Sequence, residues 1–181
     1  MAVVGYSLSG QDNDSYMYRT WKAASRCPVC RTVLDHRALN PDFRLKLDIH
    51  DVSYTYDGAC VVSESAMRAL SPFAGVEATR LPFDRDFYLL NVANAVEFDS
   101  ERRKTRFQDF CDGCNRFRSV AGATPAFLRR TSEPLAEGIY RTDVEFGTDD
   151  ERAPLLIVST GLRDVLTRQA PKGLTFRPVE G

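Results

Sequence analysis

Four cysteines form the group of residues in this chain that is best suited to chemistry. They occur as two C-x-x-C pairs, Cys27-Pro-Val-Cys30 and Cys111-Asp-Gly-Cys114, and eighty residues separate the pairs. A C-x-x-C loop lets two thiolates reach one metal ion at about 2.3 Å each, and two such loops complete a tetrahedron. Zinc accepts four thiolates readily because it imposes no ligand-field geometry. The spacing therefore predicts one zinc ion bound by Cys27, Cys30, Cys111 and Cys114.

Thiol redox chemistry is a second interpretation of the same cysteines. A redox C-x-x-C needs a thiol of lowered pKa, usually at the N-terminus of a helix, and one pair could provide it. Two pairs in one chain favour metal binding. The fifth cysteine, Cys60, lies in the apolar run ACVV and is expected to be a buried small side chain. His36 follows Cys30 by six residues, so His36 and Cys60 remain possible additional ligands.

Few other residues suggest catalysis. The two histidines, His36 and His50, have no spaced partner, and a Cys–His pair lacks any accompanying nucleophile signature. Ser63 and Ser159 follow apolar strands, but neither has the flanking glycines of a nucleophile elbow. Phosphate-binding glycine loops are also absent from the sequence. We therefore expect this protein not to be an enzyme.

The elements that must position the cysteines include an internal repeat. Residues 59–82 and 154–179 share one pattern: an apolar strand ends in Ser, a short amphipathic segment follows, and a Gly precedes a strand that ends at Pro. A Ser at that point is a preferred helix N-cap, and a Gly just past a helix supplies a positive φ. The pattern predicts two β-α-β units. The residues that mark the helix ends are Ser63 and Ser159 at the start, and Gly75 and Gly173 past the end.

Shorter patterns complete the expected fold, which is a mixed α/β (α+β) single domain over residues 1–181. Alternating or short apolar runs predict further strands, and Pro125–Arg130 predicts one turn of helix. Residues 148–154 predict a solvated loop. A zinc-ribbon-like element is expected from residues 22–34 and 107–118, stapling the N-terminal region to the middle of the chain. The predicted strands are Val3–Leu8, Tyr16–Trp21, Phe43–Ile49 and Phe87–Val92.

The composition and charge of the chain indicate which cell compartment and which kinds of partner to expect. The formal net charge is −1 and the pI is about 6.1, whereas nucleic-acid binders usually carry a basic excess. No apolar run reaches the roughly 18 residues of a membrane helix, and the N-terminus lacks the pattern of a secretion signal. We expect a cytoplasmic protein with no membrane partner. A local basic region remains, and it could be a solvated face or a docking surface for an acidic partner or RNA: Glu101–Arg106, Arg116, Arg118, Arg129 and Arg130.

Several of these segments together resemble a known protein family. CPVC, the second C-x-x-C, DFYLLNVANAVEFD before it and the C-terminal IVSTGLRDVLTRQAPKGLTFRPVE resemble the double-CXXCG immunity proteins of bacterial polymorphic-toxin systems, and their relatives with a VS…GL.F.PV segment. The resemblance extends from about Cys27 to Val179. It implies a protein that binds and neutralises a toxin encoded beside it. The matching cysteines are Cys27, Cys30, Cys111 and Cys114.

One departure from the family motif concerns the backbone. The family has Gly after the second cysteine of each pair, where this chain has Arg31 and Asn115. Asn tolerates a positive φ, but Arg does so less readily, so we expect the geometry at Cys30 to differ from that of the family. The expected function is immunity by direct binding of a cognate toxin. The alternatives are a zinc-containing nucleic-acid-binding or regulatory module and, third, a C-x-x-C thiol oxidoreductase.

Overall fold

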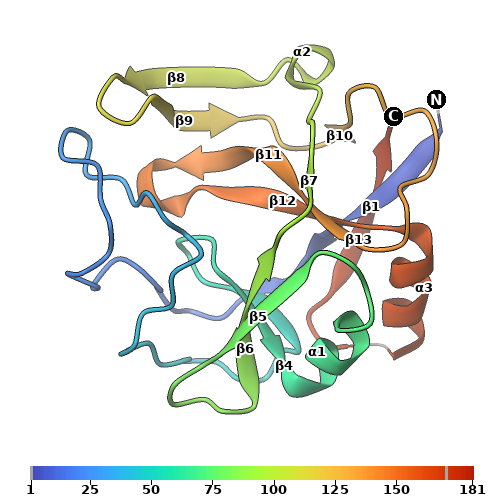
Figure 1. Cartoon of the computed structure of the whole chain (residues 1–181), viewed down its shortest axis with the longest axis horizontal. Helices are drawn as coiled ribbons and strands as arrows, with labels where there is room; N and C mark the ends of the chain where they lie inside the picture. The colour runs from blue at the N-terminus through green and yellow to red at the C-terminus, as the bar shows by residue number, and fades with distance from the viewer. Residues whose placement is uncertain (1, 170) are drawn as a thin grey trace.

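Strands dominate the computed structural model, which describes residues 2–169 and 171–181 (Figure 1). The larger sheet has eight strands among these residues, in the order β10-β13-β1-β12-β11-β9-β8, and β7 pairs in parallel with β11. The first strand of the chain, β1, therefore lies between two of the last. The strands are β1 (Val3–Ser9), β7 (Ala95–Val96), β8 (Arg106–Cys111), β9 (Arg116–Ala121), β10 (Ala126–Phe127), β11 (Ile139–Thr148), β12 (Ala153–Val158) and β13 (Thr175–Glu180).

A smaller sheet lies beneath it in the view of Figure 1, in the order β2-β3-β4-β6-β5. With α-helices beside the two sheets, the fold class is α+β, as the sequence predicts. The 3-10 turn η1 (Asp149–Glu151) connects β11 to β12. The remaining elements are β2 (Gln11–Asp12), β3 (Val52–Tyr54), β4 (Cys60–Ser63), β5 (Val76–Arg80), β6 (Phe87–Val92), α1 (Glu64–Leu70), α2 (Ser100–Arg103) and α3 (Thr160–Gln169).

Two strand–helix–strand units fall in the segments 59–82 and 154–179. In the first, β4 and β5 both pair antiparallel with β6, which lies between them. In the second, β12 and β13 both pair antiparallel with β1. The helices of the units, α1 and α3, contact each other at one end of the molecule (Figure 1). The internal repeat itself stays a prediction.

The main core forms where the two units meet. It contains Ala66 and Leu70 of α1, Leu162 and Leu166 of α3, and inward-facing residues of both sheets such as Val158. A second cluster packs the long N-terminal loop onto β4 and β6, and a third lies on the other face of the larger sheet. The β8–β9 hairpin, whose turn carries the second cysteine pair, lies at the opposite end of the molecule from the two helices (Figure 1).

Two predicted strands are absent. Tyr16–Trp21 and Phe43–Ile49 are irregular, because side chains satisfy their backbone N–H groups. The buried carboxylate of Asp57 accepts the N–H groups of Met17, Tyr18 and Arg19, at 2.8, 2.6 and 3.2 Å. In the second segment, Leu45 donates to Asp84 and Lys46 donates to Ser15. These contacts replace the ladder that a neighbouring strand would have provided.

Two further local predictions are wrong. Pro125–Arg130 is not helical, because Ala126 and Phe127 pair in parallel with β13. Residues 148–154 are not a solvated loop: the Arg152 side chain is buried and Asp150 bonds to the first cysteine segment. Val3–Leu8 and Phe87–Val92, by contrast, are strands as predicted.

Candidate metal centre

The first cysteine pair lies in a tight turn of the N-terminal loop. An isolated antiparallel bridge joins Arg26 to Val33 and closes the turn. Within it, the Cys27 N–H donates to the Thr32 carbonyl and the Arg31 N–H donates to the Cys27 carbonyl, both at 3.0 Å. These bonds close the turn. The thiols of Cys27 and Cys30 both face the second cysteine pair.

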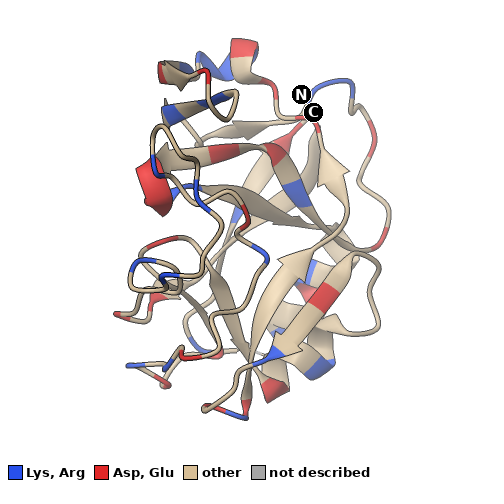
Figure 2. Ribbon diagram, turned by 60° about the vertical axis from the view of Figure 1, so that its left-hand side comes forward, with Lys and Arg blue, Asp and Glu red and all other residues tan. Residues whose placement is uncertain are grey.

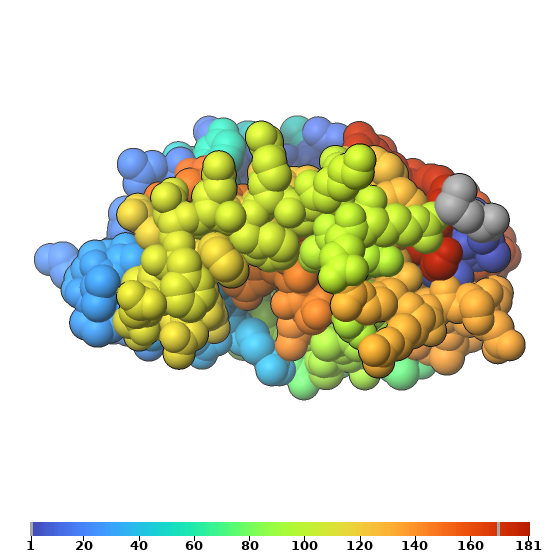
Figure 3. All heavy atoms as spheres, turned by 90° about the horizontal axis from the view of Figure 1, so that it is seen from above, coloured from blue at the N-terminus to red at the C-terminus, as the bar shows by residue number. Residues whose placement is uncertain are grey.

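The second pair occupies the turn of the β8–β9 hairpin. Cys111 is the last residue of β8 and pairs with Arg116 at the start of β9. The Cys114 N–H reaches the Cys111 carbonyl at 3.4 Å. Gly113 faces the other pair closely, since a Cβ added there would lie 2.6 Å from Val29 Cγ2. In Figure 3 the first cysteine segment, in blue, lies against the tip of this hairpin, in yellow.

Both turns use the same backbone conformation after their second cysteine. Arg31 has a φ of 67° and Asn115 a φ of 54°. The expectation that the geometry at Cys30 differs because of Arg31 is therefore wrong: Arg31 adopts the left-handed conformation that Gly would adopt more easily. The two turns are equivalent at this position.

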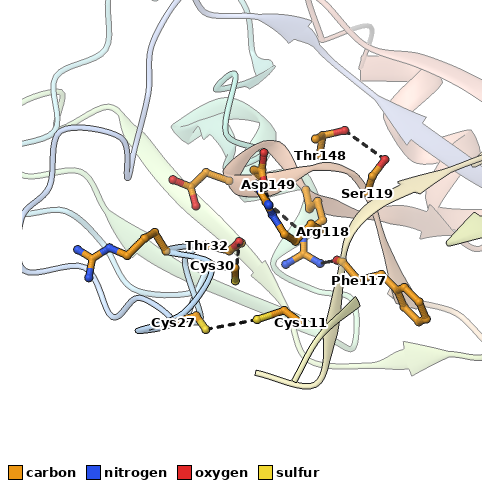
Figure 4. A network of polar contacts seen from close by, with 12 residues as sticks. Cys27, Cys30, Thr32, Cys111, Phe117, Arg118, Ser119, Thr148 and Asp149 are labelled. Carbon is orange, nitrogen blue, oxygen red and sulfur yellow. Dashed lines mark hydrogen bonds and ion pairs between the residues drawn. The ribbon is translucent and has the colours of Figure 1, made fainter. Parts of the chain in front are cut away.

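Four sulfur atoms meet between the turns. Cys27 Sγ lies 3.8 Å from Cys111 Sγ (Figure 4), and Cys30 Sγ lies 3.8 Å from Cys114 Sγ. All four sulfurs lie within 4.8 Å of one another. Thiolates at about 2.3 Å from one tetrahedral ion would be separated by about 3.8 Å. These four cysteines, the ones that the sequence singles out, are therefore close enough together to hold one metal ion.

The surroundings of the thiols favour their ionised form at the first pair. The Thr32 hydroxyl, 3.3 Å from Cys30 Sγ, is the main reason that the pKa of Cys30 falls to about 6. A backbone N–H lowers the pKa of Cys27. Burial is the main cause that raises the pKa of Cys114 to about 12. A divalent cation would overcome that last effect, because metal binding deprotonates a coordinating thiol.

Asp150, which the sequence predicts to lie in a solvated loop, supports the first cysteine turn. Asp150 accepts the Val33 N–H at 2.8 Å and pairs with Arg26 at 2.5 Å. Its neighbour Asp149 pairs with Arg118 of β9 at 2.8 Å (Figure 4). The turn between β11 and β12 thus contacts and stabilises both cysteine segments. A run of acids in a loop gives no sequence signal for this role.

The two candidate additional ligands are not part of the four-cysteine group. Cys60 is buried in β4, and burial raises its pKa to about 12. The His36 ring packs edge-on against Tyr18, with 5.2 Å between ring centroids, and burial lowers its pKa. Cys60 is a buried small side chain, as expected.

The structure also places the features on which the alternative functions depend. Neither C-x-x-C pair begins a helix, which is the usual position of a redox pair. In the basic region, positive and negative residues are interspersed (Figure 2). Three of its arginines form ion pairs with carboxylates at 2.7 to 3.5 Å: Arg102, Arg118 and Arg129.

Comparisons with known proteins do not assign the chain to a family. No protein-family model matches the chain, and no curated protein matches it. None of the helices in the described part of the chain has the length and apolarity that a membrane crossing requires. The function is therefore inferred from the residues and geometry of the chain itself.

Proposed function

We propose that this protein is an immunity protein, which binds and neutralises a toxin encoded beside it, and that one structural zinc ion stabilises it. The observation that carries the proposal is the shared backbone geometry of the two cysteine turns. Arg31 and Asn115 have positive φ values at the two positions where the double-CXXCG motif has Gly. The turns thus have the conformation that the family motif favours, although the residue types differ.

Zinc is the metal that the ligand set suits best. Four cysteines close a tetrahedral site and leave no position for a reacting water, which is typical of structural zinc. Cys27 and Cys111 are buried, so solvent reaches the ion poorly. The ion would hold together two segments that lie eighty residues apart in sequence. Because an unfolded chain offers no such site, the binding free energy of the zinc ion would add to the stability of the fold.

Metal analysis of two cysteine variants tests the zinc site. Cys111→Ser should abolish stoichiometric zinc and lower the melting temperature strongly, since one ligand and the folding free energy of the ion are lost. Cys60→Ser, the matched control, should keep one zinc per chain with a smaller loss of stability. Elemental analysis and thermal melting measure both. Wild-type melting behaviour in Cys111→Ser would contradict a structural ion.

An exposed apolar patch near the metal centre is the surface that we assign to the toxin. Val29, between the first two cysteines, is 69% exposed, and Phe110, next to Cys111, is 50% exposed. Phe107 is also exposed, and both phenylalanines pack against Phe117, with ring centroids about 5 Å apart. Protein interfaces are enriched in such aromatic residues, and the zinc ion would keep the patch rigid.

Growth of cells that express the neighbouring gene tests the function. The neighbour alone should stop growth, and co-expression of this protein should restore it. Phe110→Ala should weaken the rescue while zinc content and melting stay normal, whereas Phe83→Ala, an exposed phenylalanine 48% accessible on another segment, should rescue fully. A harmless neighbour, or one that kills regardless, would disprove the immunity proposal. Full rescue by Phe110→Ala would disprove only the assigned surface.

A further inference from the structure

A cavity of about 510 Å³ lies between the two sheets, beside the metal centre. Its walls come from β6, β9, β11 and β12 and from the loop 34–37 that follows the first cysteine turn. Ligand sites for small molecules commonly have this size and combine apolar walls with a few converging polar groups. The apolar part of this cavity is formed by residues such as Leu89, Phe117, Val120 and Leu156.

A buried arginine without an acidic partner lines the cavity. Arg152 is only 3% exposed. Its Nε donates to the Asp149 carbonyl at 3.1 Å and its Nη1 donates to the Phe117 carbonyl. None of the ion pairs found among the described residues includes Arg152. A buried guanidinium that meets only neutral carbonyls keeps its full charge, and a nearby anion would stabilise it.

Other polar groups of the cavity wall also lack acceptors. Nη1 of Arg116 and Nε2 of His36 are buried and have no hydrogen-bond partner among the described residues. Arg141 lines the cavity from β11 and forms no ion pair with any residue that the structure describes. Arginine nitrogens only donate hydrogen bonds, so Arg116 and Arg141 call for an acceptor, whereas Nε2 of a neutral His36 could either donate or accept.

The carboxylates of the cavity wall do not fill this role. Asp35 and Asp143 each accept a backbone N–H, and neither forms an ion pair with an arginine among the described residues. Glu145 lies 3.9 Å from Arg116 Nη1, which is beyond the reach of a hydrogen bond. The arginines are therefore left facing a space that no acceptor among the described residues occupies.

We propose that the cavity binds a small organic anion, in which a carboxylate or phosphate group is joined to an apolar body. The anionic group would accept hydrogen bonds from Arg116, Arg141 and Arg152, and the apolar body would lie against Leu89 and Phe117. Charge-assisted bonds from a guanidinium to such groups are strong and directional. This site does not depend on the identity of a toxin.

Calorimetric titration of the full zinc-loaded chain tests the site with four probes: phenylacetate, phenyl phosphate, inorganic phosphate and the uncharged phenylacetamide. We expect phenylacetate or phenyl phosphate to bind about tenfold more tightly than phenylacetamide, or better, as one charged hydrogen bond would give. The better of the two identifies the anionic group. Absence of binding by both at millimolar concentration, or equal binding of the uncharged probe, would overturn the proposal. So would inorganic phosphate binding as tightly as phenyl phosphate.

Arginine variants locate the binding in the cavity. Arg141→Met should lower the affinity for the tighter-binding probe about tenfold, because it removes one charged hydrogen-bond donor. The fold should tolerate the change, because Arg141 is half-buried and forms no ion pair among the described residues. Arg168→Met, an exposed arginine near the end of α3 and outside the cavity, should bind as the wild type does. Unchanged affinity in both Arg141→Met and Arg116→Met, in proteins that melt normally, would place the ligand elsewhere and refute the site.

Discussion

Arg31 and Asn115 are the residues at which the two cysteine turns reverse direction. Each follows the second cysteine of its pair, and each has a positive φ. For a residue with a Cβ this conformation costs about 1–2 kcal/mol, and Asn bears the cost better than most. The Arg31 side chain is exposed, so the cost at that position is not recovered by packing.

Replacement of Arg31 by Gly should therefore stabilise the zinc-loaded protein. Relief of the backbone strain outweighs the greater flexibility of Gly in the unfolded chain, for a net gain of about 0.5 kcal/mol. Asn115→Gly, the matched substitution in the other turn, should gain less. Urea denaturation with excess zinc measures both. A loss of stability in Arg31→Gly, with zinc still bound, would mean that the Arg31 side chain itself supports the turn.

At the scale of single elements, the sequence predicts those strands whose backbone groups bond to other strands. The apolar runs of β1 and β6 pair on both sides. The segment Tyr16–Trp21 has a similar composition, but Asp57, about forty residues away, captures its N–H groups. A single distant carboxylate leaves no periodic trace in a sequence. The four cysteines could be identified as a site because each pair has its own recognisable C-x-x-C spacing. The support from Asp150 could not, because a single carboxylate has no such pattern.

The helix caps are elements whose strength can be measured. Ser159 is fully buried, accepts the N–H groups of Leu162 and Gly138 at 3.3 and 3.2 Å, and donates to Glu137 at 2.8 Å. Ser159→Ala leaves two buried donors without an acceptor, so we expect a loss of about 2 kcal/mol. Ser63→Ala should cost about 1 kcal/mol, because that cap is only half-buried. Urea denaturation measures both losses.

A serine at the other end of α1 serves as the control for these caps. Ser71 is exposed, and its hydroxyl donates to the Arg68 carbonyl at 3.3 Å. Ser71→Ala should change stability by less than about 0.5 kcal/mol. If Ser159→Ala cost no more than Ser71→Ala, the buried hydroxyl would contribute nothing to the start of α3.

At the scale of the whole molecule, the four-cysteine site brings together two segments that lie far apart in the sequence. Among the described residues, the β8–β9 hairpin pairs with the rest of the larger sheet only where Ser119 and Val120 meet the end of β11. The first five residues of β8 are exposed. The loop that carries Cys27 is also attached through Asp57 and Asp150 and through the second hydrophobic cluster. One ion between them would hold both segments against the sheets.

Removal of the ion should therefore loosen these two segments together. When a chelator is added, amide hydrogen exchange should speed up first in residues 26–33 and in the β8–β9 hairpin, and later in β12, because local openings precede global unfolding where few contacts hold a segment. Added zinc should restore protection. Hydrogen exchange with mass spectrometry measures the order. Simultaneous loss of protection in β12 would show that the ion holds the whole fold.

The position of β1 has a consequence for how the chain is made. β1 is synthesised long before β12 and β13, the two strands with which it pairs among the described residues. Until β12 and β13 have been made, the apolar residues of β1 have neither of these strands to join, so the larger sheet closes only after both have emerged. A ribosome that stalls before β12 would release an open sheet edge, which favours aggregation and recruits chaperones. Shortages that slow translation should therefore reduce the yield of this protein more than that of proteins whose strands pair in order.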